Sequence, residues 1–322
     1  MFGLTEDFFT LAAGDTLSPQ HFTPPPPQPF QVTAVNGKVD ETLPMEQYLS
    51  NHRLGSSTFA AIQKSELALQ YEIQNKGNGD RKAYFETGTA VHSYIEAWSA
   101  GISLDAYLNT LQVVPTFNRA SKDGVSAEID YFTNLLGYVI SPPEKLADMK
   151  ILADELRKEC EKKHTFVTDK DAEVIKGITA ELQRRHNETG ILDWLKYAKS
   201  EWTFFYGHFK ARPDLLCDGL IVSVKTCAQI DNAAKDAKYK YGLKEAFYRY
   251  ILEQVTGKPH ETVFLFFETV APYQSRLIYV SPETAAFYDL EVERYIAQVT
   301  RCIETNSFKG YDAGLEYGCE II

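Results

Sequence analysis

The chain has 322 residues, of which 44% are hydrophobic, and this composition is typical of a folded globular protein rather than a disordered one. No apolar run reaches membrane-spanning length, and residues 1–7 lack the basic start of a secretory signal. Five cysteines, an odd number without a CxxC spacing, argue against a disulfide framework or zinc site and favour a reducing cytosol. The formal charge of −11 disfavours strong non-specific DNA binding but leaves room for a local basic groove.

Residues 1–53 are predicted to form a Pro-rich tail, or a strap that wraps the surface or docks a partner. The run Pro24–Pro27, with Pro29 close behind, favours extended backbone of the polyproline type. The compact domain is predicted to cover residues 54–322. It opens with a helix over residues 58–67, which Ser57 or Thr58 would cap.

The rest of the domain alternates helical and extended patterns. Apolar residues at helical spacing predict helices over residues 91–98, 126–136, 144–161, 171–186, 241–256 and 282–305. Residues 201–226 have β character, and residues 261–267 and 276–280 read as further strands. This order predicts a single α/β domain with a central mixed β-sheet flanked by helices.

A hairpin is predicted where residues 218–219, Asp-Gly, separate two apolar runs. If those two residues form the loop, Asp214 lies opposite Ser223, and Arg212 lies opposite Lys225. The hairpin would therefore bring an acidic residue and a lysine onto neighbouring strands.

Alternation along a strand places Asp214, Ser223 and Lys225 on one face, with Val222 and Val224 on the other. Metal-dependent phosphodiester hydrolysis requires a carboxylate that binds a hard cation and is helped by a lysine that orients or deprotonates the attacking water. Taken alone, the same motif is also consistent with a hairpin whose Asp and Lys are ordinary exposed residues without a catalytic role.

Four blocks of sequence resemble, in the same order, the nuclease core of the RecE (exonuclease VIII) family of PD-(D/E)XK nucleases. The blocks are residues 54–58, 88–92, 118–124 and 212–226, with 241–248 downstream. The resemblance covers about residues 54–310 and implies a restriction-endonuclease-like core. It also implies 5′ to 3′ digestion of double-stranded DNA ends with Mg²⁺ or Mn²⁺. The implied setting is phage or prophage recombination in the bacterial host cytosol, with a single-strand annealing protein as partner and a homo-oligomeric assembly.

The same resemblance implies roles for individual residues. Three residues would bind or orient the metal: His92, Asp214 and Glu201. Three occupy catalytic positions: Lys225, Ser223 and Lys244. Three more would contact the substrate: Arg212, Thr226 and Tyr241.

Two positions depart from the family pattern. The family has an acid two residues before the lysine, where this chain has Ser223, and a glutamine where this chain has Lys244. Together the two changes add two units of positive charge, and Lys244 would be able to neutralise Asp214 in place of a metal, an interaction of roughly 4 kcal/mol. The register does not place a replacement acid, for which the candidates are Asp218, Glu245 and Asp231. Two functions remain open: a working Mg²⁺-dependent exonuclease, and a degenerate relative that binds DNA ends or a protein without cleaving.

Overall fold

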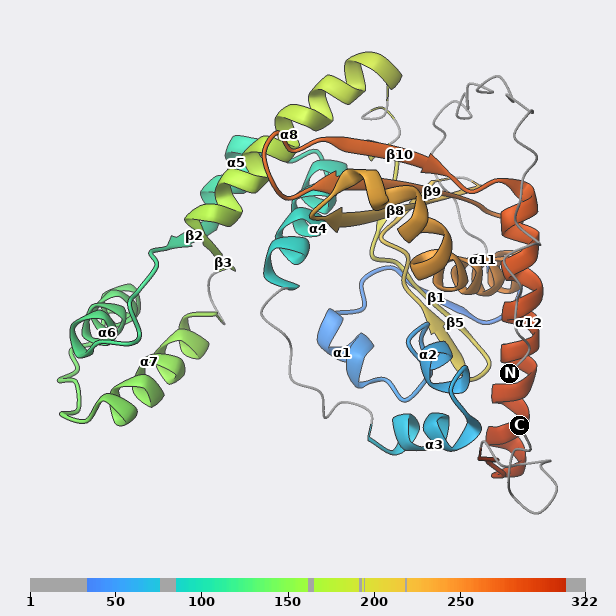
Figure 1. Cartoon of the computed structure of the whole chain (residues 1–322), viewed down its shortest axis with the longest axis horizontal. Coiled ribbons are helices and arrows are strands. Elements are labelled where there is room, and N and C mark those ends of the chain that lie inside the picture. Colours follow the sequence, from blue (N-terminus) through green and yellow to red (C-terminus); the bar gives the residue numbers. More distant parts are fainter. Residues whose placement is uncertain are drawn as a thin grey trace, which may run out of the picture.

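The computed structural model describes residues 34–75, 85–161, 165–190, 193, 195–217 and 219–310. The proline run Pro24–Pro27 and Asp218 lie outside these residues. The centre is a five-stranded sheet in the order β10-β9-β8-β7-β4 (Figure 1). Its strands are β10 (Ser275–Tyr279), β9 (Glu261–Glu268), β8 (Leu220–Cys227), β7 (Leu215–Cys217) and β4 (Lys199–Ser200). Only the β8–β9 pair is parallel, so the predicted mixed sheet is confirmed.

The predicted hairpin is β7 and β8. Cys217 pairs with Leu220, which leaves a two-residue loop, and Gly219 adopts a φ of +73° that favours glycine. Leu215 pairs with Val222, so the preceding Asp214 reaches the level of Ser223. The register expected from the sequence is therefore the register observed.

A second sheet joins β1 (Lys38–Asp40), β5 (Thr203–Tyr206) and β6 (Phe209–Ala211). The next element after β1 in the chain is α1 (Met45–Ser50), which lies against β6. The buried Lys210 ammonium of β6 donates to the backbone carbonyl oxygen of Tyr48 and, at 3.1 Å, to that of Asn51. Part of the segment predicted as a tail or strap is thus built into the folded body. The domain boundary at residue 54 stays a prediction.

The two faces of the central sheet bury different helices. Val222, Val224 and Leu265 pack in one core with α4 (Phe85–Ser99) and α8 (Asp169–Thr189). Ile221 and Leu216, on the other face, pack with α2 (Thr58–Ile62), α11 (Gly242–Thr256) and α12 (Pro282–Thr305). The alternation predicted along β8 is therefore the alternation that separates these two cores.

The helices predicted near α4, α8, α11 and α12 are confirmed, and polar caps explain several of their starts. Thr168 and Asp171 form a reciprocal capping box on α8, and Ser281 caps α12 by accepting from the Thr284 amide. The single helix predicted over residues 58–67 is wrong. Ser65 is extended and its hydroxyl accepts from the Ala68 amide, so a new helix, α3 (Glu66–Gln74), begins there.

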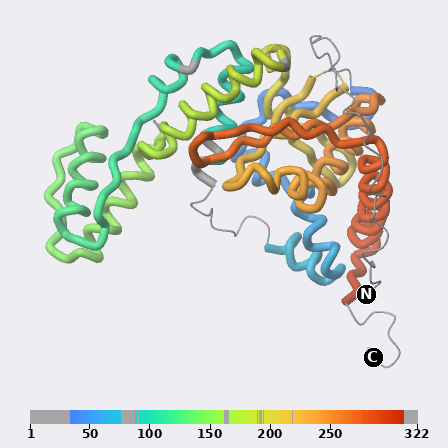
Figure 2. Tube along the Cα trace, turned by 45° about the horizontal axis from the view of Figure 1, so that its top comes forward, coloured from blue at the N-terminus to red at the C-terminus, as the bar shows by residue number. Residues whose placement is uncertain are grey.

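A helical arm projects from the body (Figures 1 and 2). Its helices α6 (Lys122–Leu136) and α7 (Leu146–Glu161), both predicted, share their own core around Ile129, Phe132 and Leu156. The connection to the body runs through α5 (Leu104–Thr110) and the parallel pair β2 (Leu111–Val114) and β3 (Thr165–Thr168). Among the described residues, none of the helices combines the length and apolar character that a membrane crossing requires.

Candidate active site

Asp214 stands directly before β7, and its carboxylate is held by the neighbouring strand. Its Oδ2 accepts from the Val224 amide at 2.9 Å and from the Lys225 ammonium at 2.9 Å. Burial alone raises the pKa of Asp214, but its electrostatic interactions with Lys225, His92 and Lys244 outweigh burial and hold this pKa well below its usual range. Asp214 is therefore ionised at neutral pH, as a metal ligand must be.

The Lys225 side chain is 9% exposed, and its ammonium group is fully hydrogen-bonded. It donates to Asp214 Oδ2, to Ser223 Oγ at 2.5 Å and to the Val224 carbonyl at 2.9 Å. These three bonds use its three hydrogens. The amine predicted beside Asp214 is there, and Lys225 rather than Lys244 is the direct partner of this carboxylate.

A second carboxylate enters the site from α11, where sequence reasoning did not place it. Oε1 of Glu245 accepts from the Ser223 hydroxyl at 2.7 Å and lies 4.0 Å from Lys225 Nζ. The Glu245 side chain is 1% exposed, and its Oε2 is buried without a hydrogen-bond partner. A buried carboxylate oxygen without a partner is costly unless a ligand completes it.

His92 reaches the site from α4, which covers the face of the sheet opposite to α11. Its Nδ1 lies 3.7 Å from Asp214 Oδ1, beyond hydrogen-bond distance, and the side chain is 32% exposed. Burial, with the nearby charges of Lys225 and Lys244, lowers the pKa of His92 against the attraction of Asp214. The imidazole is neutral at neutral pH and retains a lone pair, which is the form that binds metals.

Lys244 and Tyr241 line the α11 side of the site. The Lys244 Nζ lies 5.2 Å from the centroid of the Tyr248 ring. Burial alone lowers the pKa of Lys244, but Asp214 and Glu245 reverse this and raise it, so a cation stands near both carboxylates. The Tyr241 ring lies 5.4 Å from Lys225 Nζ.

Arg212 and Glu201 pair with each other beside Asp214. Glu201 Oε2 lies 2.7 Å from Arg212 Nε, and the Glu201 amide donates to the Asp214 carbonyl at 3.3 Å. Burial, with the charges of Asp214 and Glu96, raises the pKa of Glu201 to about 7 despite Arg212. Glu201 also has a φ of +57°, a strained conformation that often marks functional sites. Its carboxylate faces Arg212 rather than Asp214, and its predicted metal role stays untested.

Tyr48 from α1 closes this side of the site. The Arg212 guanidinium lies 5.3 Å from the Tyr48 ring centroid, and Arg212 Nη1 is buried without a hydrogen-bond partner. An unpaired buried guanidinium nitrogen is a donor available to an anion such as phosphate. Tyr48 was not among the residues predicted for the site, because it lies in the segment predicted as a tail or strap.

Thr226 marks the contact between β8 and α4. A Cβ placed on Gly88 would lie 3.3 Å from Thr226 Oγ1, so glycine at this position permits the close approach of helix and strand. This contact helps to set the position of α4, the helix that carries His92. Whether Thr226 contacts substrate stays a prediction.

These residues fit a divalent cation. Two carboxylates, Asp214 and Glu245, flank Ser223, and Glu245 has an oxygen without a partner. Mg²⁺ often takes one or two carboxylates and keeps waters and phosphate for its other positions. Within the described ranges no three His, Cys, Asp or Glu side chains are gathered closely enough to hold a metal by themselves. The residues that would hold the ion are Asp214 and Glu245, with His92 beside them.

The fold and this arrangement define a PD-(D/E)XK-type domain, with Pro213-Asp214 and Lys225 in the positions of the signature and Ser223 in the place of its second acid. The chain belongs to the family described as "PDDEXK-like domain of unknown function (DUF3799)", whose model matches residues 55–317. It is also similar to the crystal structure of a "Putative exonuclease" from Eubacterium rectale, at 15% sequence identity and a TM-score of 0.43 over 84% of this chain and 90% of that chain. No curated protein sequence matches the chain.

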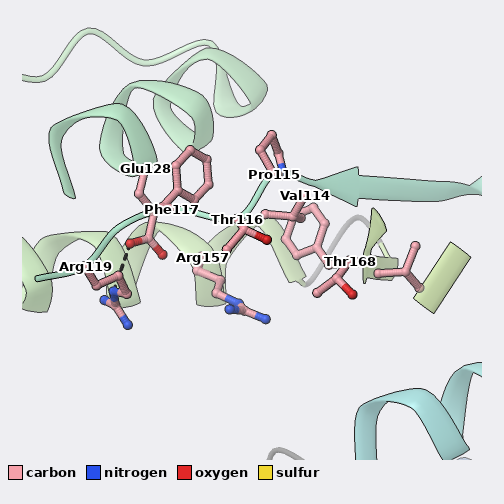
Figure 3. Close-up of a pocket in the computed structure, with 10 residues that line it drawn as sticks. Val114, Pro115, Thr116, Phe117, Arg119, Glu128, Arg157 and Thr168 are labelled. Carbon is pink, nitrogen blue, oxygen red and sulfur yellow. Dashed lines mark ion pairs between the residues drawn. The ribbon is translucent and has the colours of Figure 1, made fainter. Parts of the chain in front are cut away.

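A cavity of about 190 Å³ lies elsewhere, at the junction of the arm helices with β2 and β3 (Figure 3). Arg119 and Arg157 extend from its wall toward the same side. Arg119 is paired with Glu128 at 2.9 Å and Asp154 at 2.7 Å, and Arg157 with Glu161 at 3.0 Å. Arg119, in one of the blocks that resemble the RecE family, thus ties α6 to α7.

Proposed function

We propose that the protein is a divalent-metal-dependent DNA nuclease whose second acidic ligand comes from α11 instead of β8. The observation that carries this proposal is the bond from Ser223 to Glu245, at 2.7 Å, which brings a carboxylate to the place where the family signature has its own acid. The unpartnered Oε2 of Glu245 adds a free ligand atom in the same place. The acid lost from the strand is replaced from the helix.

Each group of the site then has a role. Asp214 and Glu245 would hold Mg²⁺ or Mn²⁺, with neutral His92 at the side of Asp214. The bound ion would supply Lewis acidity toward a water and a phosphate oxygen. The Lys225 charge lies next to both carboxylates and would stabilise negative charge on the phosphate. Arg212, through its unpaired Nη1, would hold a phosphate oxygen.

The finer assignment rests on the resemblance to the RecE family. In that proposal the substrate is the end of a DNA duplex, digested 5′ to 3′, and the protein acts in phage or prophage recombination beside a single-strand annealing protein. A homo-oligomer in the bacterial cytosol belongs to the same proposal. The residue blocks at 54–58, 88–92 and 212–226 support it.

A second candidate is a degenerate family member that binds DNA ends or a protein partner without cleaving. The ion pair between Lys225 and Asp214, at 2.9 Å, favours this candidate, because it neutralises the carboxylate without a metal. The raised pKa of Lys244 keeps a further cation nearby, which disfavours a divalent ion in the same space.

One digestion experiment separates the candidates. Linear duplex labelled at either the 5′ or the 3′ end is incubated with the wild type, Asp214→Ala and Glu245→Gln in Mg²⁺ and in Mn²⁺. A working nuclease digests the duplex, and both variants lose at least about 100-fold in rate, as expected for lost metal ligands. If only the double variant Ser223→Asp with Lys244→Gln digests DNA, the protein is degenerate. Wild-type digestion that survives Glu245→Gln would refute the role of the helix acid.

A further inference from the structure

A short helical segment leads from β8 to α11 and carries a row of lysines and a tyrosine. It comprises η2 (Ile230–Asn232), α10 (Ala233–Lys235) and the π-helix η3 (Asp236–Tyr241), and Figure 1 shows it in orange beside β8 and β9. π-helical turns are rare in proteins, and those that occur are often located at functional sites. We name Lys235, Lys238, Tyr239 and Lys240 the lysine–tyrosine ridge.

One side of this segment is anchored to the sheet. Ala237 packs in one core with Phe264 and Phe266, and the Tyr241 ring lies 6.1 Å from each phenyl ring. The Tyr288 hydroxyl adds a hydrogen bond to the Lys238 carbonyl. The inner residues anchor the segment to the sheet, so the ridge is the outer side of packed helical turns.

The ridge is positively charged, and Lys235, Tyr239 and Lys240 are exposed while Lys238 is half-buried. Tyr239 is 64% exposed, and Lys238 Nζ lies 5.2 Å from its ring centroid. The segment from 235 to 241 carries three lysines and one acid, Asp236, a local excess of two positive charges in a chain of net charge −11. Single exposed aromatics are common, so exposure alone does not define a binding site.

The ridge is continuous with the candidate active site. The Tyr241 ring has Lys225 Nζ at 5.4 Å and Lys240 Nζ at 5.0 Å from its centroid. One tyrosine ring therefore contacts both the buried lysine beside Asp214 and the exposed lysine of the ridge. A bound strand would pass from Lys240 to the site over this single ring.

We propose that the lysine–tyrosine ridge binds single-stranded DNA next to the active site, with one base stacked on Tyr239 and phosphates against Lys235 and Lys240. Exposed aromatic rings between cations are the usual means of binding single strands, because every base offers a π-face. In a duplex those faces are already stacked, so the ridge discriminates in favour of an unpaired strand. The proposal rests on the proposed function for DNA as the substrate.

The test measures binding without cleavage. Anisotropy of a fluorescein-labelled 20-nucleotide oligo(dT) is recorded in EDTA with the wild type, Tyr239→Ala, Tyr239→Phe and Tyr71→Ala. Tyr71 is 68% exposed on α3 and serves as the matched control. Tyr239→Ala weakens binding about 10-fold, whereas Tyr239→Phe and Tyr71→Ala stay within about twofold of the wild type. Equal binding by wild type and Tyr239→Ala, or absence of binding by the wild type, overturns the proposal.

Two further measurements report contacts rather than folding. The double variant Lys235→Gln with Lys240→Gln reduces the salt dependence of binding by about 1.4 in log–log slope, or about 0.7 per lost phosphate contact. The exposed lysines Lys64 and Lys122, changed in the same way, leave it unchanged. Ultraviolet crosslinking of an iododeoxyuridine oligonucleotide should label Tyr239, and a label confined to other residues contradicts the stacking.

The ridge and the nuclease proposal fail separately. If duplex digestion depends on Asp214 but Tyr239→Ala binds oligo(dT) normally, the ridge is refuted and the nuclease stands. If no digestion occurs but Tyr239→Ala loses binding, the nuclease is refuted and the ridge stands as a DNA-binding surface.

Discussion

The Ser223 hydroxyl on β8 donates to Oε1 of Glu245 on α11, and the two atoms lie 2.7 Å apart. The serine fills the strand position where the family signature has an acid, and the hydrogen bond ties to it a carboxylate from the next helix. The loss of an acid at position 223 is therefore not a loss of acidity in the site.

This relationship predicts that the acid can be moved back. Glu245→Gln should reduce Mn²⁺ binding and duplex digestion by at least about 100-fold, because one of two carboxylates is removed. The double variant Ser223→Asp with Glu245→Gln should recover part of both, measured by isothermal titration with Mn²⁺ and by release of end label. Glu253→Gln, an exposed change on the same helix, is the control and should behave as wild type. Failure of the double variant to exceed Glu245→Gln would contradict the substitution of one acid for the other.

A second prediction concerns the lysine. Lys225→Met leaves the buried Asp214 carboxylate without its cation, which should lower the free energy of unfolding by about 3 kcal/mol in EDTA. Mn²⁺ should then raise the melting temperature of Lys225→Met more than that of the wild type, since an ion that binds only the folded state stabilises it by mass action. Differential scanning fluorimetry with and without Mn²⁺ measures this. The exposed Lys176→Met should show neither effect. Equal responses to Mn²⁺ in wild type and Lys225→Met would reject metal binding at Asp214.

A third prediction concerns acid stability. Burial alone raises the pKa of Glu66, but hydrogen bonds from Gln298, Arg301 and the Lys309 amide lower it to about 2, from an ordinary 4.5. A lowered folded-state pKa contributes stability above the unfolded pKa, and that stability is lost as pH falls through the folded value. Urea unfolding should show Glu66→Gln less stable by about 2 kcal/mol at pH 7.

The difference between Glu66→Gln and wild type should shrink between pH 4.5 and pH 2. The exposed Glu72→Gln on the same helix is the control and should track the wild type at every pH. A difference that grows as the solution is acidified would show the opposite sign and refute the assignment.

A fourth prediction separates the arm from the body. Arg119→Ala removes the ion-pair partner of Glu128, whose side chain is 4% exposed, and leaves this buried acid without that partner. We expect this change to destabilise the packing of α6 against α7 by about 1–3 kcal/mol. Hydrogen exchange should accelerate in α6 and α7 and stay unchanged in α11.

The double variant Arg119→Ala with Glu128→Gln should recover part of the protection in the arm, because no buried charge is left. Arg294→Ala, which breaks an exposed pair with Glu291, should have no measurable effect on exchange. Acceleration spread equally over arm and body would show that the arm does not open on its own.

The sequence allowed the hairpin and the faces of β8 to be predicted because both follow from local rules. The Asp-Gly loop determines the register, and alternation along the strand assigns Ser223 and Val224 to opposite faces. The long helices were equally accessible, since their apolar spacing and their caps lie within a few residues of one another.

The position of Glu245 could not be predicted in this way. Three short helical segments, one of them a π-helix, separate β8 from α11. No local sequence pattern determines the orientation of α11 relative to β8 across these segments. Lys244 and Glu245 are neighbours, yet one lies near the Tyr248 ring and the other reaches Ser223. Tyr48 was missed for a different reason, because the proline composition of residues 1–53 outweighed the weak signal of a six-residue helix.

Saturation of the Lys225 ammonium has a consequence for any chemistry at this site. With every N–H directed to Asp214, Ser223 and the backbone, the amine has no proton to offer an incoming molecule. Its positive charge can act on a bound substrate without any rearrangement, but it can donate a hydrogen bond to that substrate only after one of the three existing bonds breaks. The bond to the Asp214 carboxylate is the one we expect to break, since a metal ion that binds Asp214 would replace the ammonium there.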